Sequence, residues 1–349
     1  MSLIDQEQAA ALPSGSRSRR DFLRLVGQSV ASTALLAGCG LPQIDSGTTS
    51  TPMMETPRAT SPLPPSPEST TQEKPAVSLD IKIGQMLMVG FRGLELTNDH
   101  FIVQDIRKRH LGGVVLFDYD VPTRQPVRNI ESPSQVMALV AFLQSASTKP
   151  LLVAIDHEGG FITRLKAGHG FPPSVSHQYL GQINNLTTTH EHASRMAKTL
   201  KELGINLNLA PVIDLCVNPD NPIIAKYERC FSADPQLVTD HALQFIRAHH
   251  EQDMLCTLKH FPGHGSSAQD SHLDLVDVTH TWSRIELEPY AGIIQAGQVD
   301  AIMTAHVFNT NLDAQNPATL SQATITGLLR EELGYQGVIV SDDMQMRAI

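Results

Sequence analysis

Residues 254–265, with the sequence MLCTLKHFPGHG, form the segment around which the rest of the chain is organised. The apolar run 254–258 predicts a buried strand, and the proline and glycines that follow end regular structure. Three histidines, a lysine and an aspartate fall within the fourteen residues 259–272. Titratable groups gathered at the end of a strand are suited to proton transfer or ligand capture. The segment therefore predicts a strand of a larger sheet with a functional site at its end.

The pair Asp270 and His272 is the most specific feature of this loop. A carboxylate two residues from an imidazole can accept one ring N–H, which leaves the other ring nitrogen to exchange a proton. Two other interpretations stay open from the residues alone. The loop could be a solvated, histidine-rich surface segment, or His260, His264 and His272 could be zinc ligands. The spacing is not that of a common zinc motif, so we expect no metal site.

The composition narrows the function classes. The chain has 349 residues, with 36 acidic against 26 basic side chains. The basic footprint of a nucleic-acid-binding protein is therefore absent, and we expect no nucleic-acid partner. The four cysteines, Cys39, Cys216, Cys230 and Cys256, contain no CxxC pair. A bridge between Cys216 and Cys230 is one option, but an odd set remains once Cys39 is set aside, so we expect buried free thiols.

Seven apolar segments predict strands, and helical periodicity separates most of them. The predicted strands are 85–91, 113–117, 151–155, a segment within 205–215, 254–258, 301–306 and 337–340. The predicted helices are 99–109, 132–146, 187–203, 235–250, 285–296 and 322–333. Repeated β–α units with apolar strands indicate a parallel sheet, and so many units favour a (β/α)8 TIM-type barrel over a doubly wound open sheet. No GxGxxG motif follows the first strand, so a dinucleotide fold is not supported.

Polar residues follow five successive strands of this pattern. They are Asp156 to Glu158, Asp214 with Asn208, Lys259 with His260, His306, and Asp342 with Asp343. In a barrel the carboxyl ends of all strands face one mouth, where active sites lie. A single Asp at such a junction is usually a helix cap. Recurrence at five strand ends favours a site instead.

Residues 1–39 predict an export signal. The segment 18–23, SRRDFL, resembles a twin-arginine signal, and the apolar segment 25–38 is too short and too rich in small residues for a membrane span. The segment ends in Leu-Ala-Gly-Cys39, which resembles a bacterial lipobox, whose cysteine is lipidated and becomes the mature N-terminus. We expect an exported lipoprotein anchored through Cys39 on the extracytoplasmic face of a membrane. A short apolar N-terminal helix is the alternative.

Residues 40–78 are rich in Ser, Thr and Pro. Such a composition cannot bury an apolar core, so we expect a disordered tether between the anchor and the folded part. The folded part, 79–349, is then one catalytic barrel.

Motifs along nearly all of residues 79–349 resemble glycoside hydrolase family 3, in its single-domain bacterial β-N-acetylhexosaminidase branch. The matching segments are 83–87 (IGQML), 155–160 (IDHEGG), 208–214 (NLAPVID), 229–231 (RCF), 259–272, 303–306 (MTAH), 317–321 (PATLS) and 340–344 (VSDDM). The block KHFPGHG followed by DSH is specific to this branch. In the two-domain β-glucosidase members the acid/base is typically a Glu on a later domain.

The resemblance implies a retaining double displacement. Asp342 matches the nucleophile, which would form a covalent glycosyl-enzyme. His272 matches the acid/base of this branch, with Asp270 as its orienting partner. Strand alternation points Asp343 the other way, so we expect it to cap or orient. The loop glycines suggest a segment that closes over substrate.

The resemblance also implies contacts to the hydroxyls and N-acetyl group of the terminal sugar. They carry over onto Asp156, Arg164, Arg229, Lys259 and His260. Charged partners suit paired hydroxyls. Two residues depart from the family pattern, and we expect either to alter the rim or the leaving-group side. His157 stands where Gln is usual, and Phe161 where Arg is common.

The family pattern continues past the nucleophile strand with a helix, an eighth strand and its helix, whereas this sequence reaches Ile349. We therefore expect a barrel that lacks its last strand–helix unit, in a truncated or incompletely recorded chain. An unclosed barrel would expose a sheet edge, so the sequence as it stands is expected to be unstable or inactive.

These inferences predict an exo-acting glycosidase that releases terminal β-linked N-acetylglucosamine from peptidoglycan fragments or related oligosaccharides. A phosphorylase of the same specificity is the near alternative, because a histidine acid/base avoids the repulsion between a carboxylate and phosphate. A catalytically inactive, surface-anchored glycan-binding lipoprotein is the alternative from another class. No cofactor is implied, and we expect a monomer.

Overall fold

The computed structural model describes residues 77–349. The predicted export signal with Cys39 and most of the predicted tether lie outside these residues. Among the described residues, no helix combines the length and the apolar character that a membrane crossing requires.

Seven parallel strands form the main sheet, in the order β1-β2-β3-β6-β7-β9-β11. The strands are β1 (Met88–Gly90), β2 (Gly113–Leu116), β3 (Leu152–Ile155), β6 (Leu207–Asn208), β7 (Leu255–Phe261), β9 (Ala301–Thr304) and β11 (Val338–Ser341). The predicted parallel sheet of seven strands is thereby confirmed. Strands β1 and β11 lie at its two edges.

Side chains from all seven strands gather in one apolar cluster on the inner face of the sheet. Its members are Ala154, Leu207, Leu209, Leu255, Ala301 and Met303, with Met88, Val115, Leu152, Val338 and Val340 packed against them. Both edge strands contribute to this cluster, so the sheet is curled as in an incomplete TIM barrel. Because side chains alternate along a strand, Val153 and Ile155 point outward instead, into the layer between sheet and helices.

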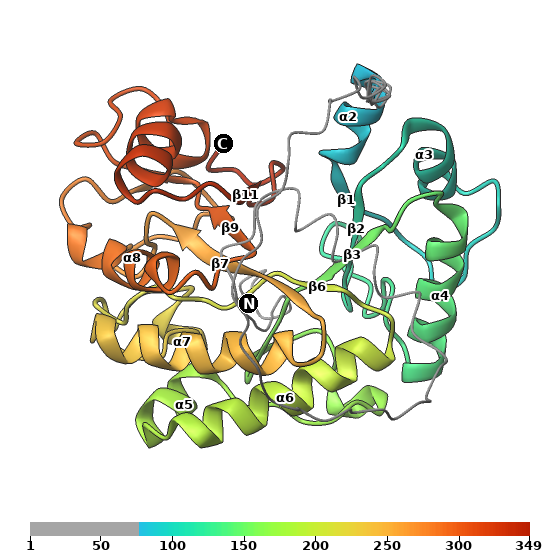
Figure 1. Ribbon diagram of the computed structural model, residues 1–349, viewed down its shortest axis with the longest axis horizontal. Coiled ribbons are helices and arrows are strands. Elements are labelled where there is room, and N and C mark those ends of the chain that lie inside the picture. Colours follow the sequence, from blue (N-terminus) through green and yellow to red (C-terminus); the bar gives the residue numbers. More distant parts are fainter. Residues whose placement is uncertain (1–76) are drawn as a thin grey trace, which may run out of the picture.

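Helices cover the outer face of the curled sheet (Figure 1). They are α3 (Phe101–Arg109), α4 (Pro133–Ala146), α5 (His177–Ile183), α6 (Leu186–Glu202), α7 (Pro235–His250) and α8 (Glu288–Gln295). Helix α2 (Leu79–Gln85) stands beyond the end of β1 and buries only Gly84 (Figure 1). A π-helix, η6 (Ala323–Glu332), precedes β11. Short 3-10 turns are η2 (Ala167–His169), η3 (Ala225–Tyr227), η4 (Arg284–Leu287) and η5 (Ala318–Leu320).

The helices that the sequence places best have caps visible in the sequence. Ser132 accepts a hydrogen bond from the backbone of Gln135 at the start of α4, and Asp234 accepts one from Gln236 at the start of α7. Each cap is followed by a proline in the first turn, where the missing N–H is no loss. The predicted range 235–250 matches α7, and 132–146 differs from α4 by one residue.

The first predicted strand, 85–91, is partly wrong. Residues up to Gln85 belong to α2, and β1 covers only Met88–Gly90. The Ser78 side chain caps a helix just before the predicted strand by accepting from the Ile81 N–H, and this helix extends to Gln85. Gly84 lets this helix approach α3 closely, because a Cβ on it would lie 1.9 Å from the Arg109 carbonyl oxygen.

Two short pairs of strands stand at the ends of the main strands. Strands β4 (His157–Gly159) and β5 (Ile162–Thr163) pair antiparallel after β3, and β8 (Val276–Asp277) and β10 (Val307–Phe308) pair in parallel. These pairs and α5 were not predicted, since two- and three-residue strands carry too little periodicity.

The prediction of free thiols at positions 216 and 230 is wrong. Cys216 and Cys230 form a disulfide, with their Cα atoms 5.6 Å apart, whereas Cys256 is a buried free thiol. The segment between them folds back on itself, and the Cys216 N–H donates to the Ser232 carbonyl at 2.9 Å. Chain reversal of this kind has no signature in cysteine spacing alone.

Candidate active site

Lys259, at the end of β7, connects two carboxylates that follow β3. Its Nζ lies 2.7 Å from Asp156 Oδ1 and 3.3 Å from Glu158 Oε1. Asp156 and Glu158 are two residues apart in an extended segment, which puts both side chains on the same side. Burial raises the pKa of Asp156, but Lys259 and Arg164 lower it by more, so this carboxyl is ionised at any ordinary pH. Asp156 remains partly exposed and can reach a ligand.

Arg229 forms a bidentate pair with Glu158. Arg229 Nε and Nη2 lie 2.7 and 3.0 Å from the two Glu158 oxygens, and Nη1 donates to the Ile223 carbonyl at 3.0 Å. Both side chains are buried. Burial raises the pKa of Glu158, but Arg229 and Lys259 outweigh it, and the pKa lies below its ordinary value. Removal of either partner would leave an uncompensated buried charge.

His260 is held between a carboxylate and a guanidinium. Its Nδ1 lies 2.7 Å from Asp214 Oδ2, and its Nε2 lies 3.2 Å from Arg229 Nη2. Because arginine can only donate, Nε2 accepts, and the ring proton sits on Nδ1 and is donated to Asp214. Burial and the charges of Arg229 and Lys259 hold the pKa of His260 well below 6.5, so the ring is neutral.

The predicted sugar-binding residues therefore come together in one network. Arg164 joins it through Asp156, at 3.1 Å between Nη2 and Oδ2. Five predicted residues from four separate stretches of sequence thus line one end of the sheet, as expected for Asp156, Arg164, Arg229, Lys259 and His260. Glu158 and Asp214 fix this network, because Glu158 pairs with Arg229 and Asp214 pairs with His260. The sequence flagged both as polar strand-end residues without assigning them a role.

In the described part of the chain, His260, His264 and His272 are not arranged as ligands of one zinc ion. His264 Nδ1 pairs with the Ser267 hydroxyl and Nε2 lies 3.2 Å from the Ser271 hydroxyl, while both His260 nitrogens are engaged as above. No group of three or more His, Cys, Asp or Glu side chains is arranged to hold a metal within residues 77–349. His264 instead fixes the loop that begins at Pro262.

The Asp270–His272 pair forms as predicted. Asp270 Oδ1 accepts from the His272 backbone N–H at 2.9 Å and pairs with His272 Nδ1 at 2.8 Å. Burial raises the pKa of Asp270, but its hydrogen bonds to His272 outweigh this and lower it. The carboxylate is largely buried, whereas 35% of the His272 side chain is exposed. The imidazole is therefore anchored on one side and reaches solvent on the other.

Asp342 stands at the end of β11, where its N–H donates to the Thr304 carbonyl of β9 at 3.2 Å. Burial raises its pKa, but four basic groups lower it by more, so the pKa lies below 3.8; they are His260, His272, His306 and Lys259. The half-buried carboxylate is thus ionised near neutral pH, and the groups that act on it come from both the Lys259–His260 network and the loop, which supplies His272. An ionised carboxylate is what a nucleophile requires.

Asp343 has the capping role expected of it. Its Oδ1 accepts from the Gln345 N–H at 2.9 Å, and its carbonyl oxygen lies 3.0 Å from His306 Nε2. His306 is buried, and its Nδ1 contacts the Thr319 hydroxyl at 2.8 Å. This histidine therefore fixes the backbone beside Asp342.

The two departures from the family pattern behave differently. Phe161 is 64% exposed and stands on the surface, as a rim residue would. His157 is buried and pairs with the Thr163 hydroxyl at 2.6 Å, so it is not itself exposed at the rim. Burial, with the charge of Arg164, lowers the pKa of His157 to about 3, which keeps it neutral.

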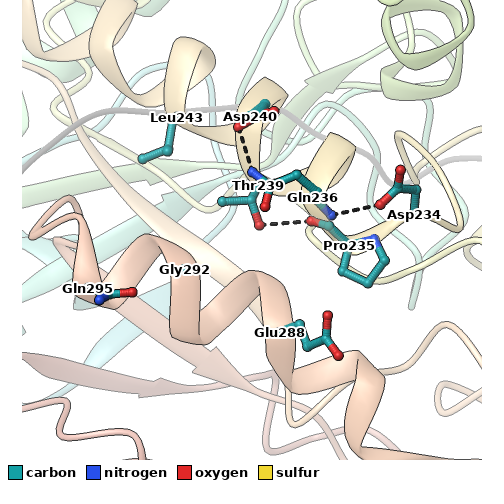
Figure 2. A pocket seen from close by; sticks show the side chains of 9 residues that line it. All are labelled: Asp234, Pro235, Gln236, Thr239, Asp240, Leu243, Glu288, Gly292 and Gln295. Carbon is teal, nitrogen blue, oxygen red and sulfur yellow. Dashed lines mark hydrogen bonds between the residues drawn. The ribbon is translucent and has the colours of Figure 1, made fainter.

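A cavity of about 410 Å³ lies apart from these strand ends, between α7 and α8 (Figure 2). On its α7 side the polar groups pair with one another: Gln236 contacts Asp234 and Asp240, and the Thr239 hydroxyl donates to the Pro235 carbonyl. None of the predicted site residues lines it.

Known proteins resemble this chain in sequence and in fold. The model of the glycosyl hydrolase family 3 N-terminal domain matches residues 78–349. The β-hexosaminidase of Tolumonas auensis is 39% identical over 265 residues, which cover 74% of each chain. Native NagZ from Neisseria gonorrhoeae has a similar structure, with a TM-score of 0.66 at 30% identity over 75% of this chain and 74% of that one.

The structure of a family 3 β-N-acetylglucosaminidase from Paenibacillus sp. str. FPU-7 is also similar, with a TM-score of 0.71 and 39% identity. That match covers 78% of this chain and 51% of the Paenibacillus chain, so the chain spans about half of that protein.

Proposed function

The chain belongs to glycosyl hydrolase family 3, and we propose that it is a retaining exo-enzyme that removes terminal β-linked N-acetylglucosamine from peptidoglycan fragments or related oligosaccharides. It is a glycoside hydrolase of the β-hexosaminidase type. One observation carries the mechanistic part of the proposal. An ionised carboxylate, Asp342, interacts electrostatically with a solvent-accessible histidine, His272, that a second carboxylate orients.

In the first step, Asp342 attacks the anomeric carbon and the bond to the leaving oxygen breaks. His272 gives its Nε2 proton to that oxygen, because Asp270 holds the Nδ1 side of the ring. The products are the free aglycone alcohol and a covalent glycosyl ester on Asp342. The neutral His272 then takes a proton from water, whose oxygen attacks the anomeric carbon and releases Asp342. Most retaining glycosidases use a second carboxylate where this chain has a histidine.

The buried network supplies the binding of the terminal sugar. Asp156 is its exposed member, and Lys259 and Arg164 fix this carboxylate so that it can accept hydrogen bonds from sugar hydroxyls. Preformed contacts of this kind lower the entropy cost of orienting the sugar over the nucleophile. The proposed preference for N-acetylglucosamine rests on similar proteins, one of which is a family 3 β-N-acetylglucosaminidase.

The test is nitrophenol release from 4-nitrophenyl N-acetyl-β-glucosaminide by the full chain. Asp342→Asn should lower kcat at least about 10³-fold, since it removes the nucleophile. The neighbour provides the matched control: Asp343→Asn keeps an acceptor for the Gln345 N–H in the turn and should retain activity within a few-fold. Turnover that survives in Asp342→Asn would refute the assignment.

A phosphorylase remains the second candidate, favoured by the histidine in place of a carboxylate acid/base. Turnover that rises with added phosphate and yields the sugar 1-phosphate would establish it, whereas turnover independent of phosphate supports the hydrolase. Glycan binding without turnover would favour the inactive binding protein. The presence of Asp342, Asp270 and His272 together argues against that outcome.

We also propose export and membrane anchoring through Cys39, which rest on the sequence motif of residues 36–39. Fractionation of cells that express the full chain provides the test. The protein should sediment with membranes, and Cys39→Ser should release it from them. A wild-type chain found wholly in the soluble fraction would contradict the anchor.

A further inference from the structure

The loop that carries Asp270 and His272 is fixed at its base by a buried carboxyl group outside the predicted site. Glu286, on η4, accepts a hydrogen bond from the Gly265 N–H, with 2.9 Å between N and Oε2. The side chain is 1% exposed. Ser266, the next residue of the loop, also interacts with this carboxyl group through its hydroxyl and its backbone. Burial of a carboxyl group is costly even when it is hydrogen-bonded, so its place at the loop base calls for an explanation beyond packing.

The loop backbone lies unusually close to Glu286. Gly263 has a φ of +125°, and a Cβ on it would lie 2.6 Å from Glu286 Cβ. A Cβ on Gly265 would lie 1.9 Å from the Leu215 carbonyl oxygen on the opposite side. The two glycines therefore let the loop base pass between Glu286 and the segment after β6.

Other contacts hold the same few residues. Asp214 accepts from the His264 N–H at 2.8 Å, and Asn221 Nδ2 lies 2.8 and 3.1 Å from the carbonyl oxygens of His264 and Gly265. Trp282, just before η4, donates to the Pro262 carbonyl at 3.0 Å. The loop base is thus fixed from several sides, whereas residues 273–275, beyond His272, are exposed.

The position of the acid/base side chain depends on this base. His272 is half-buried and takes its orientation from Asp270 on the same loop. A shift of the loop base would carry both residues away from Asp342 together. Misplacement of a catalytic group by about 1 Å can cost on the order of 10²-fold in rate.

We propose that Glu286 is a positioning residue for the acid/base loop. Through the Gly265 N–H it sets where His272 stands relative to Asp342. This inference rests on the proposed function, in which His272 protonates the leaving group.

Leaving-group dependence provides a specific test. A 2,4-dinitrophenyl leaving group departs without protonation, whereas a phenyl leaving group needs the acid. We expect Glu286→Ala, in the full chain, to lower kcat/KM on phenyl N-acetyl-β-glucosaminide about 10- to 100-fold more than on the dinitrophenyl glycoside. Glu286→Gln keeps an acceptor for the Gly265 N–H and should restore most of the loss. Glu288→Gln, two residues along and exposed, is the matched control and should match the wild type.

The ratio of the two kcat/KM values does not depend on the fraction of folded protein, so a partly unfolded Glu286→Ala preparation still gives an answer. An unchanged ratio in Glu286→Ala would overturn the inference. His272→Ala separates this outcome from failure of the proposed function. If His272→Ala changes the ratio and Glu286→Ala does not, only the positioning role fails. If His272→Ala leaves the ratio unchanged, the acid/base assignment itself fails, and the positioning role with it.

Discussion

The two parts of the site are built in opposite ways. The network around Lys259 and Arg229 is largely buried, and Lys259, Arg229, Asp156 and Glu158 each face an opposite charge within 3.3 Å. The Asp270–His272 pair lies on a loop, and a third of the histidine is exposed. Charges in the network are fixed in one ionisation state, whereas the loop histidine keeps access to water.

The difference fits the role that we propose for each part. Groups that bind hydroxyls must not titrate or move, and burial against opposite charge ensures both. A group that gives and takes a proton must change its charge in each cycle, which deep burial would oppose. The network should therefore determine stability, and the loop should determine rate.

Removal of one charge from the network should have the largest effect on stability. Arg229→Leu leaves Glu158 buried without its bidentate partner, and we expect the free energy of unfolding to fall by about 3–5 kcal/mol. Chemical denaturation measures it. Lys198→Ala is the control, because its pair with Glu202 is exposed and 3.9 Å long, and it should change stability by less than about 1 kcal/mol. Equal losses in both variants would contradict the comparison.

The stability of the loop anchor should depend on pH. Burial raises the pKa of Glu286 from 4.5 to about 7, with the charge of Asp214 adding to the effect. A group whose pKa is raised on folding stabilises the fold below its unfolded pKa, and this stability is lost as the pH rises through its folded pKa. Between pH 4 and pH 8 the wild type should therefore lose about 3 kcal/mol that Glu286→Gln does not lose.

Chemical denaturation of both proteins across this pH range measures the difference between their free energies of unfolding. Groups that titrate equally in both proteins cancel in this difference. Asp214 and Tyr290 are the neighbouring titratable groups, and both are present in the wild type and in Glu286→Gln. A difference that stays constant with pH would show that Glu286 does not titrate in this range.

The disulfide should stabilise the segment that joins the two parts of the site. Residues between Cys216 and Cys230 include Ile223, which contacts Arg229, and Asn221, which holds the loop base. A bridge across 14 residues is expected to contribute about 3 kcal/mol, by restriction of the unfolded chain. Cys216→Ser with Cys230→Ser should lose that amount in thermal unfolding, and Cys256→Ser provides a control outside the bridge.

The loop pair should show the smallest effect on stability and a clear effect on rate. Asp270→Asn removes the charge that stabilises a protonated His272, and we expect kcat/KM on phenyl N-acetyl-β-glucosaminide to fall about 10- to 100-fold. The free energy of unfolding should change by about 1 kcal/mol or less. A large loss of stability with little loss of rate would reverse the distinction drawn between the two regions.

Much of this site could be predicted from the sequence, for reasons that the structure makes clear. Asp342, Lys259 and His260 directly follow apolar runs, and parallel strands bring their carboxyl ends to one edge. Asp270 and His272 are two residues apart, so their pairing is local. Glu286 and Asn221 could not be predicted, because one lies on a 3-10 turn and the other in a long loop, and neither follows a strand.

The sequence by itself located the seven strands of the main sheet, the first of them only in part, since an apolar run of four to seven residues tends to be buried wherever it lies. It also determined which polar side chains those strands present at their ends. The tertiary structure decided the pairings: Lys259 meets Asp156 across 103 residues, and Arg229 meets Glu158 across 71. Only these long-range contacts fix the His260 proton on Nδ1 and the charge states around Asp342, because a pKa depends on neighbours in space.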